Sequence, residues 1–186
     1  MSTKHPIISI TGSSGACTNT LKSTFDQIFR REGIETVSIE GDAFHRYNRA
    51  DMKAELDRRY ADGDQTFSHF SYEANELGKL EEVFRSYSES GTGETRHYVH
   101  DEDEAVRYGA EPGTFTDWTP CDEGSELLVY EGLHGAVVND DVNLAALADL
   151  KVGVVPVINL EWTQKIHRDS AKRGYTTEAV TDTILR

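Results

Sequence analysis

Residues 7–20, IISITGSSGACTNT, have the form of a phosphate-binding turn. A short apolar run ends at Gly12, and a turn with Gly15 leads into a helical pattern. Such a turn directs backbone N–H groups at an anion, and the N-terminus of the following helix favours negative charge. Gly12 and Gly15 fit this need, in a candidate phosphate-binding turn that comprises Gly12, Ser13, Ser14, Gly15, Ala16, Cys17, Thr18, Asn19 and Thr20.

This turn departs from the usual pattern G-x-x-x-x-G-K-[ST] at its end. Cys17, Thr18 and Asn19 stand where that pattern has glycine, lysine and serine or threonine. A strand and a helix joined by a tight turn, with no ligand, is the alternative interpretation.

A carboxylate follows the second predicted strand, TVSIE at residues 36–40. In doubly wound folds the carboxyl ends of strands form the ligand crevice, so we expect Asp42 to lie near bound phosphates. There it would accept a proton from a substrate hydroxyl, or orient that hydroxyl for attack. Gly41-Asp42 is also an ordinary turn or helix cap.

Basic side chains next to this carboxylate recur every four residues, at His45, Arg49 and Lys53. A helix places such residues on one face, so the spacing predicts a ladder of donors for a sugar phosphate. Residues 46–59 and 165–173 together hold 9 of the 19 lysines and arginines. On a chain of net charge −14 two positive patches suit a small, multiply charged anion, unless each is simply a solvated helix face.

A second carboxylate, Glu131, ends the apolar run ELLVYEG at residues 126–132. Strand-then-acid is the form of an element that holds Mg²⁺ directly or through water. The same pattern is common in proteins without such a site. A glycine-containing turn after the first strand favours the metal interpretation here.

Residues 161–174, EWTQKIHRDSAKRG, are predicted to form a helix that ends at glycine. Its side chains Lys165, Arg168, Asp169 and Arg173 are candidates to close over a transferred phosphoryl group. The alternative is an exposed helix on which Lys165 and Asp169 form an ordinary ion pair one turn apart.

Hydrophobic periodicity predicts the other elements. Leu21, Phe25, Ile28 and Phe29 indicate a helix that packs on a sheet and ends near Gly33. Further helices are expected over 49–63, 73–87 and from 176 onward, with strands over 95–100 and 152–160, the latter buried on both faces. Residues 101–104 are expected to be a solvated acidic run, and His69 a packing or capping residue.

The composition of these 186 residues fits one domain. No apolar stretch has the length of a membrane span and no basic-then-apolar leader is present, so a soluble cytoplasmic protein is expected. The net charge of −14 argues against coating nucleic acid or an anionic membrane. Cys17 and Cys121 are expected to be free thiols.

Taken together, these motifs resemble the phosphoribulokinases, specifically the bacterial type of the Calvin cycle. The similarity extends over essentially the whole chain, through GSSGA, SIEGDAFHR, NRADMKAELDRRY, FSHFSYEANEL, YEGLHGAVVN, VPVINLEW, QKIHRD and RGYTTEAVTD. It implies an α/β fold of the P-loop type, with a mixed but mainly parallel sheet flanked by helices, as in nucleoside and nucleotide kinases.

The resemblance also implies a reaction, transfer of the γ-phosphate of Mg-ATP to ribulose 5-phosphate. ATP and Mg²⁺ are then the expected cofactors. Asp42 would be the base, and Glu131 and Asp169 would serve the metal or the reacting centre. Lys165, Arg168 and Arg173 would stabilise the transferred phosphate or bind substrate. The residues expected to contact the sugar phosphate are His45, Arg49, Lys53 and His100.

Bacterial members of the family are typically octamers activated by NADH and inhibited by AMP, and Arg31 aligns with a position tied to that regulation. Family members also continue well past Arg186. Cys17 and Asn19 replace the family's glycine and serine, and Ser170 stands where a basic residue is expected. A Cβ atom at position 17 would force a strained backbone if φ is positive, at a cost of about 1–3 kcal/mol.

Two other functions remain open on the sequence. A nucleotide-binding module without catalysis would follow if the altered turn misplaces Mg-ATP. A nucleoside kinase similar to uridine kinase would share the turn and the acid after the second strand. The basic residues at 45, 49 and 53 disfavour the latter, because a nucleoside has no phosphate to clamp.

Overall fold

The structure, a computed structural model, describes residues 4–121 and 124–185, without the side chains of Lys172 and Arg173. The chain divides into two compact units. One, here called the sheet unit, comprises Met1–Phe44, Leu77–Arg96 and Trp118–Val155. The other, the helical unit, comprises His45–Glu76, His97–Asp117 and Pro156–Arg186.

A four-stranded parallel sheet forms the centre of the sheet unit, in the order β2-β5-β1-β6. Its strands are β1 (Ile7–Gly12), β2 (Thr36–Glu40), β5 (Leu127–Gly132) and β6 (Leu150–Val154). The short strands β3 (Glu94–Thr95) and β4 (Thr119–Pro120) pair antiparallel in a separate sheet. The mainly parallel sheet expected from the sequence is therefore confirmed.

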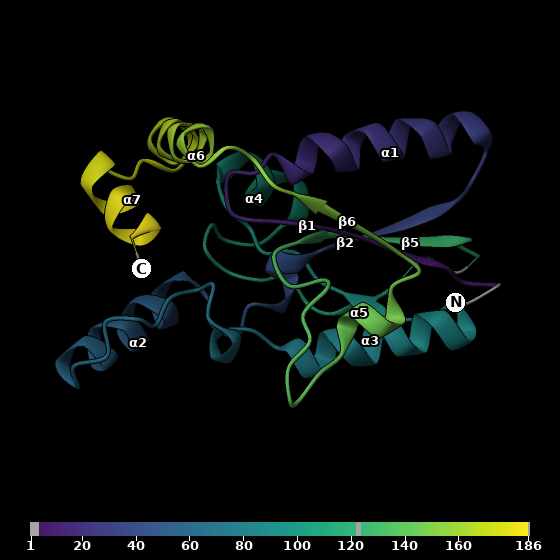
Figure 1. The fold of residues 1–186 in the computed structure, drawn as a ribbon, viewed down its shortest axis with the longest axis horizontal. Coiled ribbons are helices and arrows are strands. Elements are labelled where there is room, and N and C mark those ends of the chain that lie inside the picture. Colours follow the sequence, from purple (N-terminus) through teal and green to yellow (C-terminus); the bar gives the residue numbers. More distant parts are fainter. Residues whose placement is uncertain (1–3, 122–123, 186) are drawn as a thin grey trace. The chain divides into compact units, whose positions relative to one another are not determined.

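Helices cover both faces of the parallel sheet (Figure 1). On one face, α1 (Thr18–Glu32) packs Leu21, Phe25 and Phe29 against buried residues of β1 and β5. On the other lie α3 (Leu77–Ser90) and α5 (Leu144–Leu147), whose buried side chains share a core with Ile7. Burial on both faces explains why β1 and β5 are apolar at successive positions. Ile28 was expected in the buried stripe of α1, but it is 48% exposed.

The helical unit contains four α-helices and one short 3-10 helix in its described residues. They are α2 (Arg49–Ala61), η2 (Tyr72–Ala74), α4 (Glu102–Tyr108), α6 (Ile158–Arg173) and α7 (Thr177–Ile184). The side chains of Asn48, Asp101 and Thr176 each accept a backbone N–H at the start of a helix, which fixes where α2, α4 and α7 begin. No described helix is long and apolar enough to cross a membrane.

Three expected elements differ from the structure. The strand over 95–100 is wrong beyond Thr95, because His97 and Val99 bond to Thr116 and Thr114 in a loop ladder instead. The acidic run 101–104 has its two central residues exposed, as expected, but it was not assigned to a helix and forms the N-cap and first turn of α4, where carboxylates interact favourably with the helix dipole. The helix expected over 73–87 begins only at Leu77, after η2.

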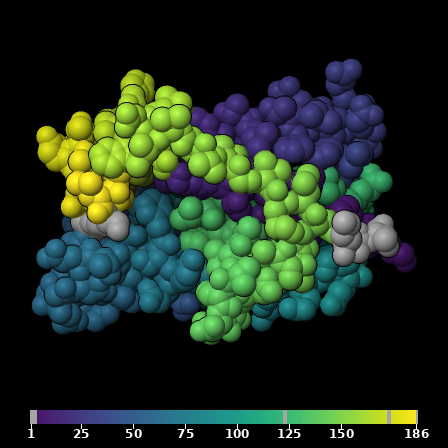
Figure 2. Space-filling model, in the orientation of Figure 1, coloured from purple at the N-terminus to yellow at the C-terminus, as the bar shows by residue number. Residues whose placement is uncertain are grey.

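The strand expected over 152–160 is also wrong in its second half. Its expected burial on both faces is wrong as well, because β6 is an edge strand of the sheet and none of its residues is fully buried. β6 ends at Val154 and α6 begins at Ile158. Pro156 has no N–H for a strand ladder and disfavours a helical residue before it, so the chain is punctuated there. Val155 and Val157 are 91% and 71% exposed, and Figure 2 shows the yellow-green segment after β6 on the surface.

Candidate active site

The turn after β1 is built around two glycines. A Cβ atom at Gly12 would lie 2.8 Å from Thr18 Cγ2 and 2.9 Å from the Val154 carbonyl oxygen, so only glycine fits there. Gly15 has a φ of 112°, which side-chain-bearing residues rarely adopt. The Ala16 N–H donates to the Ser13 carbonyl oxygen at 2.9 Å and closes the turn. Backbone N–H groups and the first turn of α1 thus gather at one place, as a phosphate requires.

Cys17 is the residue in this turn with a strained backbone. Its φ of 61° and ψ of 34° are left-handed, and it is the sole non-glycine residue with positive φ in the described part of the chain. The side chain is exposed and makes no capping hydrogen bond to α1. The strain expected from a Cβ atom at position 17 is therefore present.

Glu131 lies at the end of β5 with its carboxylate beside the turn. Thr18 donates its hydroxyl hydrogen to Glu131 Oε1 in a short hydrogen bond. Burial raises the pKa of the Glu131 carboxyl, and the nearby charges of Asp42 and Glu40 raise it further, against the opposing effect of the Thr18 bond. The neighbouring carboxylates repel the negative charge of Glu131, so a cation bound beside it would stabilise its ionised form.

Asp42 follows β2 in a 3-10 turn, η1 (Gly41–Phe44). In the parallel register Glu40 is the partner of Glu131, so β2 and β5 end side by side. Gly41 and Gly132 make this possible, since a Cβ atom at Gly132 would lie 2.8 Å from Gly41 Cα. The prediction that Asp42 lies at the carboxyl edge of the sheet is confirmed.

These oxygen ligands suit Mg²⁺. The ion is usually held by one or two carboxylates together with substrate phosphates and water. No group of three or more His, Cys, Asp or Glu side chains in the described residues forms a metal cage. Glu131, with the Thr18 hydroxyl against it, is the group that would hold the ion.

The ladder predicted for His45, Arg49 and Lys53 is only partly correct. Asn48 caps α2, so the helix begins at Arg49 and His45 lies outside it. His45 instead forms an isolated bridge with Asn75, and its Nδ1 lies 2.8 Å from Asn75 Oδ1. Arg49 and the exposed Lys53 share a face of α2 one turn apart.

Arg49 meets a second candidate residue, His100. Its Nη2 donates to the His100 carbonyl oxygen at 2.7 Å, and its backbone N–H donates to the Gly113 carbonyl oxygen at 2.8 Å. Tyr98 adds an aromatic contact that links the two histidines, with ring centroids 5.9 Å from His45 and 4.9 Å from His100. His45, Arg49 and His100 are therefore close neighbours within the helical unit.

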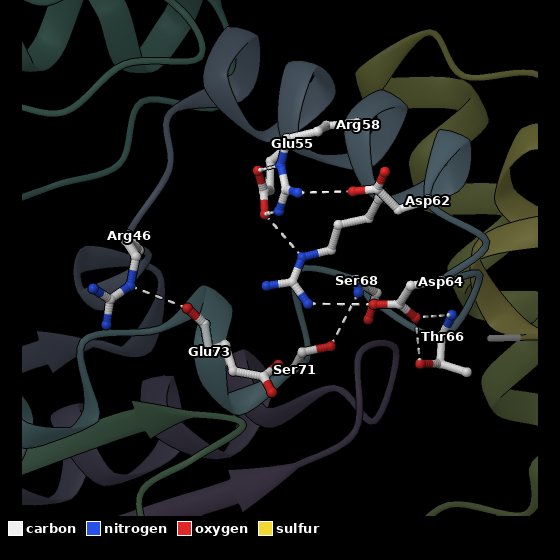
Figure 3. A network of polar contacts seen from close by, with 10 residues as sticks. Arg46, Glu55, Arg58, Asp62, Asp64, Thr66, Ser68, Ser71 and Glu73 are labelled. Carbon is white, nitrogen blue, oxygen red and sulfur yellow. Dashed lines mark hydrogen bonds and ion pairs between the residues drawn. The ribbon is translucent and has the colours of Figure 1, made fainter.

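The remaining basic residues of 46–59 have acidic partners, and Figure 3 shows those that surround Glu55. Arg58 pairs with Glu55 and Asp62, and Arg59 pairs with Glu55 and Asp64. Arg46 donates to the Glu73 carbonyl oxygen and pairs with Glu76. The pairs of Arg58 and Arg59 lie within α2 and the loop after it, whereas Arg46 pairs outside the helix. The predicted positive patch is therefore reduced to Arg49 and Lys53 on α2.

On α6 the residues Lys165 and Asp169 form a buried ion pair. Lys165 Nζ lies 3.1 Å from Asp169 Oδ2, and the two residues are 5% and 4% exposed. Arg168 Nε donates to Asp169 Oδ1 at 2.8 Å, and the Lys165 ammonium lies 5.4 Å from the Phe70 ring centroid. The alternative of an exposed surface pair is wrong. The Arg173 side chain lies outside the described part of the structure.

Sequence reasoning missed two partners of candidate residues. Asn75 binds His45 from a position 30 residues along the chain, and nothing in the sequence signals this pairing. Thr18 was assigned to the nucleotide site, but its bond to Glu131 depends on the pairing of β1 with β5. The pattern of an apolar strand followed by an acid identifies Glu131 but not its partner Thr18.

A parallel sheet with helices on both faces, a glycine turn between β1 and α1, and acids ending β2 and β5 define the P-loop kinase class. Residues 7–186 match the Phosphoribulokinase / Uridine kinase family, and the chain belongs to it.

Individual relatives agree with this assignment. The chain is 76% identical over 186 residues to phosphoribulokinase 1 of Cereibacter sphaeroides, covering 100% of this chain and 64% of the relative. It is 65% identical over 183 residues to a phosphoribulokinase of Nitrobacter vulgaris, covering 98% and 63%. A solved phosphoribulokinase from Rhodobacter spheroides superposes with a TM-score of 0.85 at 72% identity, covering 98% of this chain and 62% of that structure. The chain thus spans about 64% of the curated relatives' length.

Proposed function

We propose that the chain is the N-terminal part of a phosphotransferase that moves the γ-phosphate of ATP to ribulose 5-phosphate, giving ribulose 1,5-bisphosphate. The observation that carries the proposal is the pairing of β2 with β5, which brings Asp42 and Glu131 to one edge of the sheet. A base and a metal ligand at that edge are what in-line transfer to a hydroxyl needs.

The sheet unit would bind the nucleotide. Backbone N–H groups of residues 12–20 would hold the phosphates, and Glu131 would hold Mg²⁺, which neutralises charge on the phosphate oxygens when bound. Asp42 would take the proton of the attacking hydroxyl, a role that contributes a factor of about 10²–10⁴ in rate.

The helical unit would bind the sugar phosphate and the transferred group. Arg49 and Lys53 on α2, with His45 and His100 beside them, supply donors for an anion. Lys165, Arg168 and Arg173 would stabilise charge on the transferred phosphoryl group, and Asp169 would orient Lys165 or serve the metal.

Competition with nucleosides tests the choice of acceptor. The proposal predicts that ribulose 5-phosphate stimulates ADP release and that uridine neither stimulates nor inhibits it. Uridine-dependent ADP release would instead establish a nucleoside kinase.

A catalytically impaired nucleotide-binding module is the second candidate, favoured by the strained Cys17. It predicts nucleotide binding without phosphoryl transfer. Restoring Cys17→Gly and Asn19→Ser in a chain extended with the C-terminal part of a relative distinguishes the two. Activity that appears only after restoration would identify an impaired kinase.

We further propose that the full-length protein is a cytoplasmic homo-oligomer activated by NADH and inhibited by AMP, with Arg31 in the regulatory site. Sedimentation of the extended chain and its response to both nucleotides would test this.

A further inference from the structure

The side-chain amide of Asn75 has one orientation that satisfies its neighbours. Asn75 is 3% exposed, and its Nδ2 donates to the carbonyl oxygens of His69 at 3.0 Å and Ser71 at 2.8 Å. Only the NH₂ group can serve two carbonyl oxygens, since the amide oxygen cannot donate. Asn75 Oδ1 therefore points at His45 Nδ1, 2.8 Å away.

This orientation determines which nitrogen of His45 carries a proton. An amide oxygen only accepts, so His45 Nδ1 must be the donor across that contact. In the neutral imidazole the lone pair is then on Nε2, the nitrogen on the far side of the ring. The hydrogen-bond partner of one ring nitrogen thus determines whether the other nitrogen is a donor or an acceptor in the neutral ring.

The backbone holds the two residues in register for this bond. His45 and Asn75 form an antiparallel bridge, and the Arg46 N–H donates to the Ala74 carbonyl oxygen at 2.9 Å. The Arg46 side chain donates to the Glu73 carbonyl oxygen at 3.0 Å, a contact visible in Figure 3. Rotation of the Asn75 amide would lose both of its carbonyl partners. The side-chain contacts and the backbone bridge therefore agree on which atom of Asn75 faces His45.

We propose that Asn75 is a positioning residue that holds His45 as the Nδ1–H tautomer, with the lone pair of the neutral ring on Nε2. As the proposed function has it, Nε2 would accept a hydrogen bond from a sugar hydroxyl when neutral and donate to a phosphate oxygen when protonated. The tautomer itself does not depend on that function.

Long-range ¹⁵N–¹H correlation spectra of the histidine-labelled chain, above the titration range of imidazole, test the proposal. His45→Gln assigns the His45 signals. The expected result is a protonated Nδ1 and an unprotonated Nε2 at His45 in the wild type. Asn75→Leu, which removes the acceptor, is expected to shift His45 toward the Nε2–H form.

Ser71→Ala is the matched control, because it removes the Ser71 hydroxyl that accepts the Ser68 N–H in the same loop without touching the imidazole. It is expected to leave the tautomer unchanged. An Nε2–H form in the wild type, or an unchanged tautomer in a folded Asn75→Leu, would overturn the proposal. Should Asn75→Leu fail to fold, the tautomer of His45 in the wild type decides it.

Kinetics separate this proposal from the proposed function. Asn75→Leu is expected to raise KM for ribulose 5-phosphate roughly tenfold, the effect of about one hydrogen bond, with a smaller change in kcat. The expected tautomer without any sugar-phosphate-dependent turnover would contradict the function and leave the assignment of Asn75 intact.

Discussion

Lys165 and Asp169 form an ion pair of 3.1 Å one turn apart on α6, and both residues are almost wholly buried. Removing two charges from water costs several kcal/mol per ion, which their attraction offsets only while both are present. Loss of either residue should therefore destabilise the fold more than loss of one partner of an exposed ion pair.

Asp169→Asn is expected to destabilise the fold by about 3–5 kcal/mol, because it leaves the Lys165 ammonium buried without its counter-charge. The double variant Lys165→Met/Asp169→Leu should lose much less, because no buried charge is left without a counter-charge; Arg168, which also loses its bond to Asp169, has a side chain that is 34% exposed to water. Urea unfolding of both variants measures the difference. A double variant that loses as much as Asp169→Asn would refute the buried-charge explanation.

Cys17→Gly is expected to stabilise the chain by about 1 kcal/mol relative to Cys17→Ala, because glycine adopts a positive φ without strain. Cys17→Ala keeps the Cβ atom and is the matched control. Urea unfolding with and without ATP would show the gain. Equal stability of the two variants would mean that the left-handed geometry at residue 17 carries no strain.

Glu131→Gln is expected to stabilise the chain at neutral pH while it weakens Mg²⁺-dependent binding of ATP. Burial raises the pKa of this carboxyl, so the folded state favours the protonated form. The stabilisation that the protonated Glu131 carboxyl gives the folded state is present at low pH and is lost as the pH rises through the raised pKa. Glutamine mimics the protonated acid and still accepts the Thr18 bond, so the two proteins should converge in acid.

Thermal unfolding of Glu131→Gln and the wild type from pH 4 to pH 7 tests the direction of this pH dependence. A wild type that gains stability over Glu131→Gln as the pH rises, in the absence of Mg²⁺, would contradict it.

Glu55 has the opposite dependence on pH. Hydrogen bonds from Arg58 and Arg59 lower the pKa of its carboxyl from 4.5 to about 2. Its contribution is therefore present above pH 4.5 and is lost as the pH falls toward 2. Comparing Glu55→Gln with the wild type across this range should show a difference that shrinks in acid, and a constant difference would exclude charge as its cause.

Local pattern predicted much of the fold. The glycine turn, β2, the end of α1 at Gly33 and the acid at the end of β5 were predicted correctly, because each depends on neighbours in sequence. Alternation of apolar residues and left-handed glycine caps are signals of that kind.

The failures have a common physical origin in contacts between distant residues. Spacing placed His45 on a helix, but the Asn48 side chain starts α2 later and Asn75 draws His45 into a bridge. The apolar run after residue 152 was interpreted as one strand, although Pro156 divides it. The burial of Lys165 likewise could not be predicted, because the spacing of charged residues on a helix does not show which of them are buried.

The most direct test of the proposed reaction is ADP release from Mg-ATP by the 186-residue chain, with and without ribulose 5-phosphate. Asp42→Asn is the control, since it keeps the shape of the side chain and removes the base. We predict sugar-phosphate-dependent turnover that falls by a factor of about 10²–10⁴ in this variant, in the 186-residue chain or, if that chain is inactive, in one extended with a relative's C-terminal part. Turnover by Asp42→Asn within about tenfold of the wild type would contradict the assignment of Asp42 as the base.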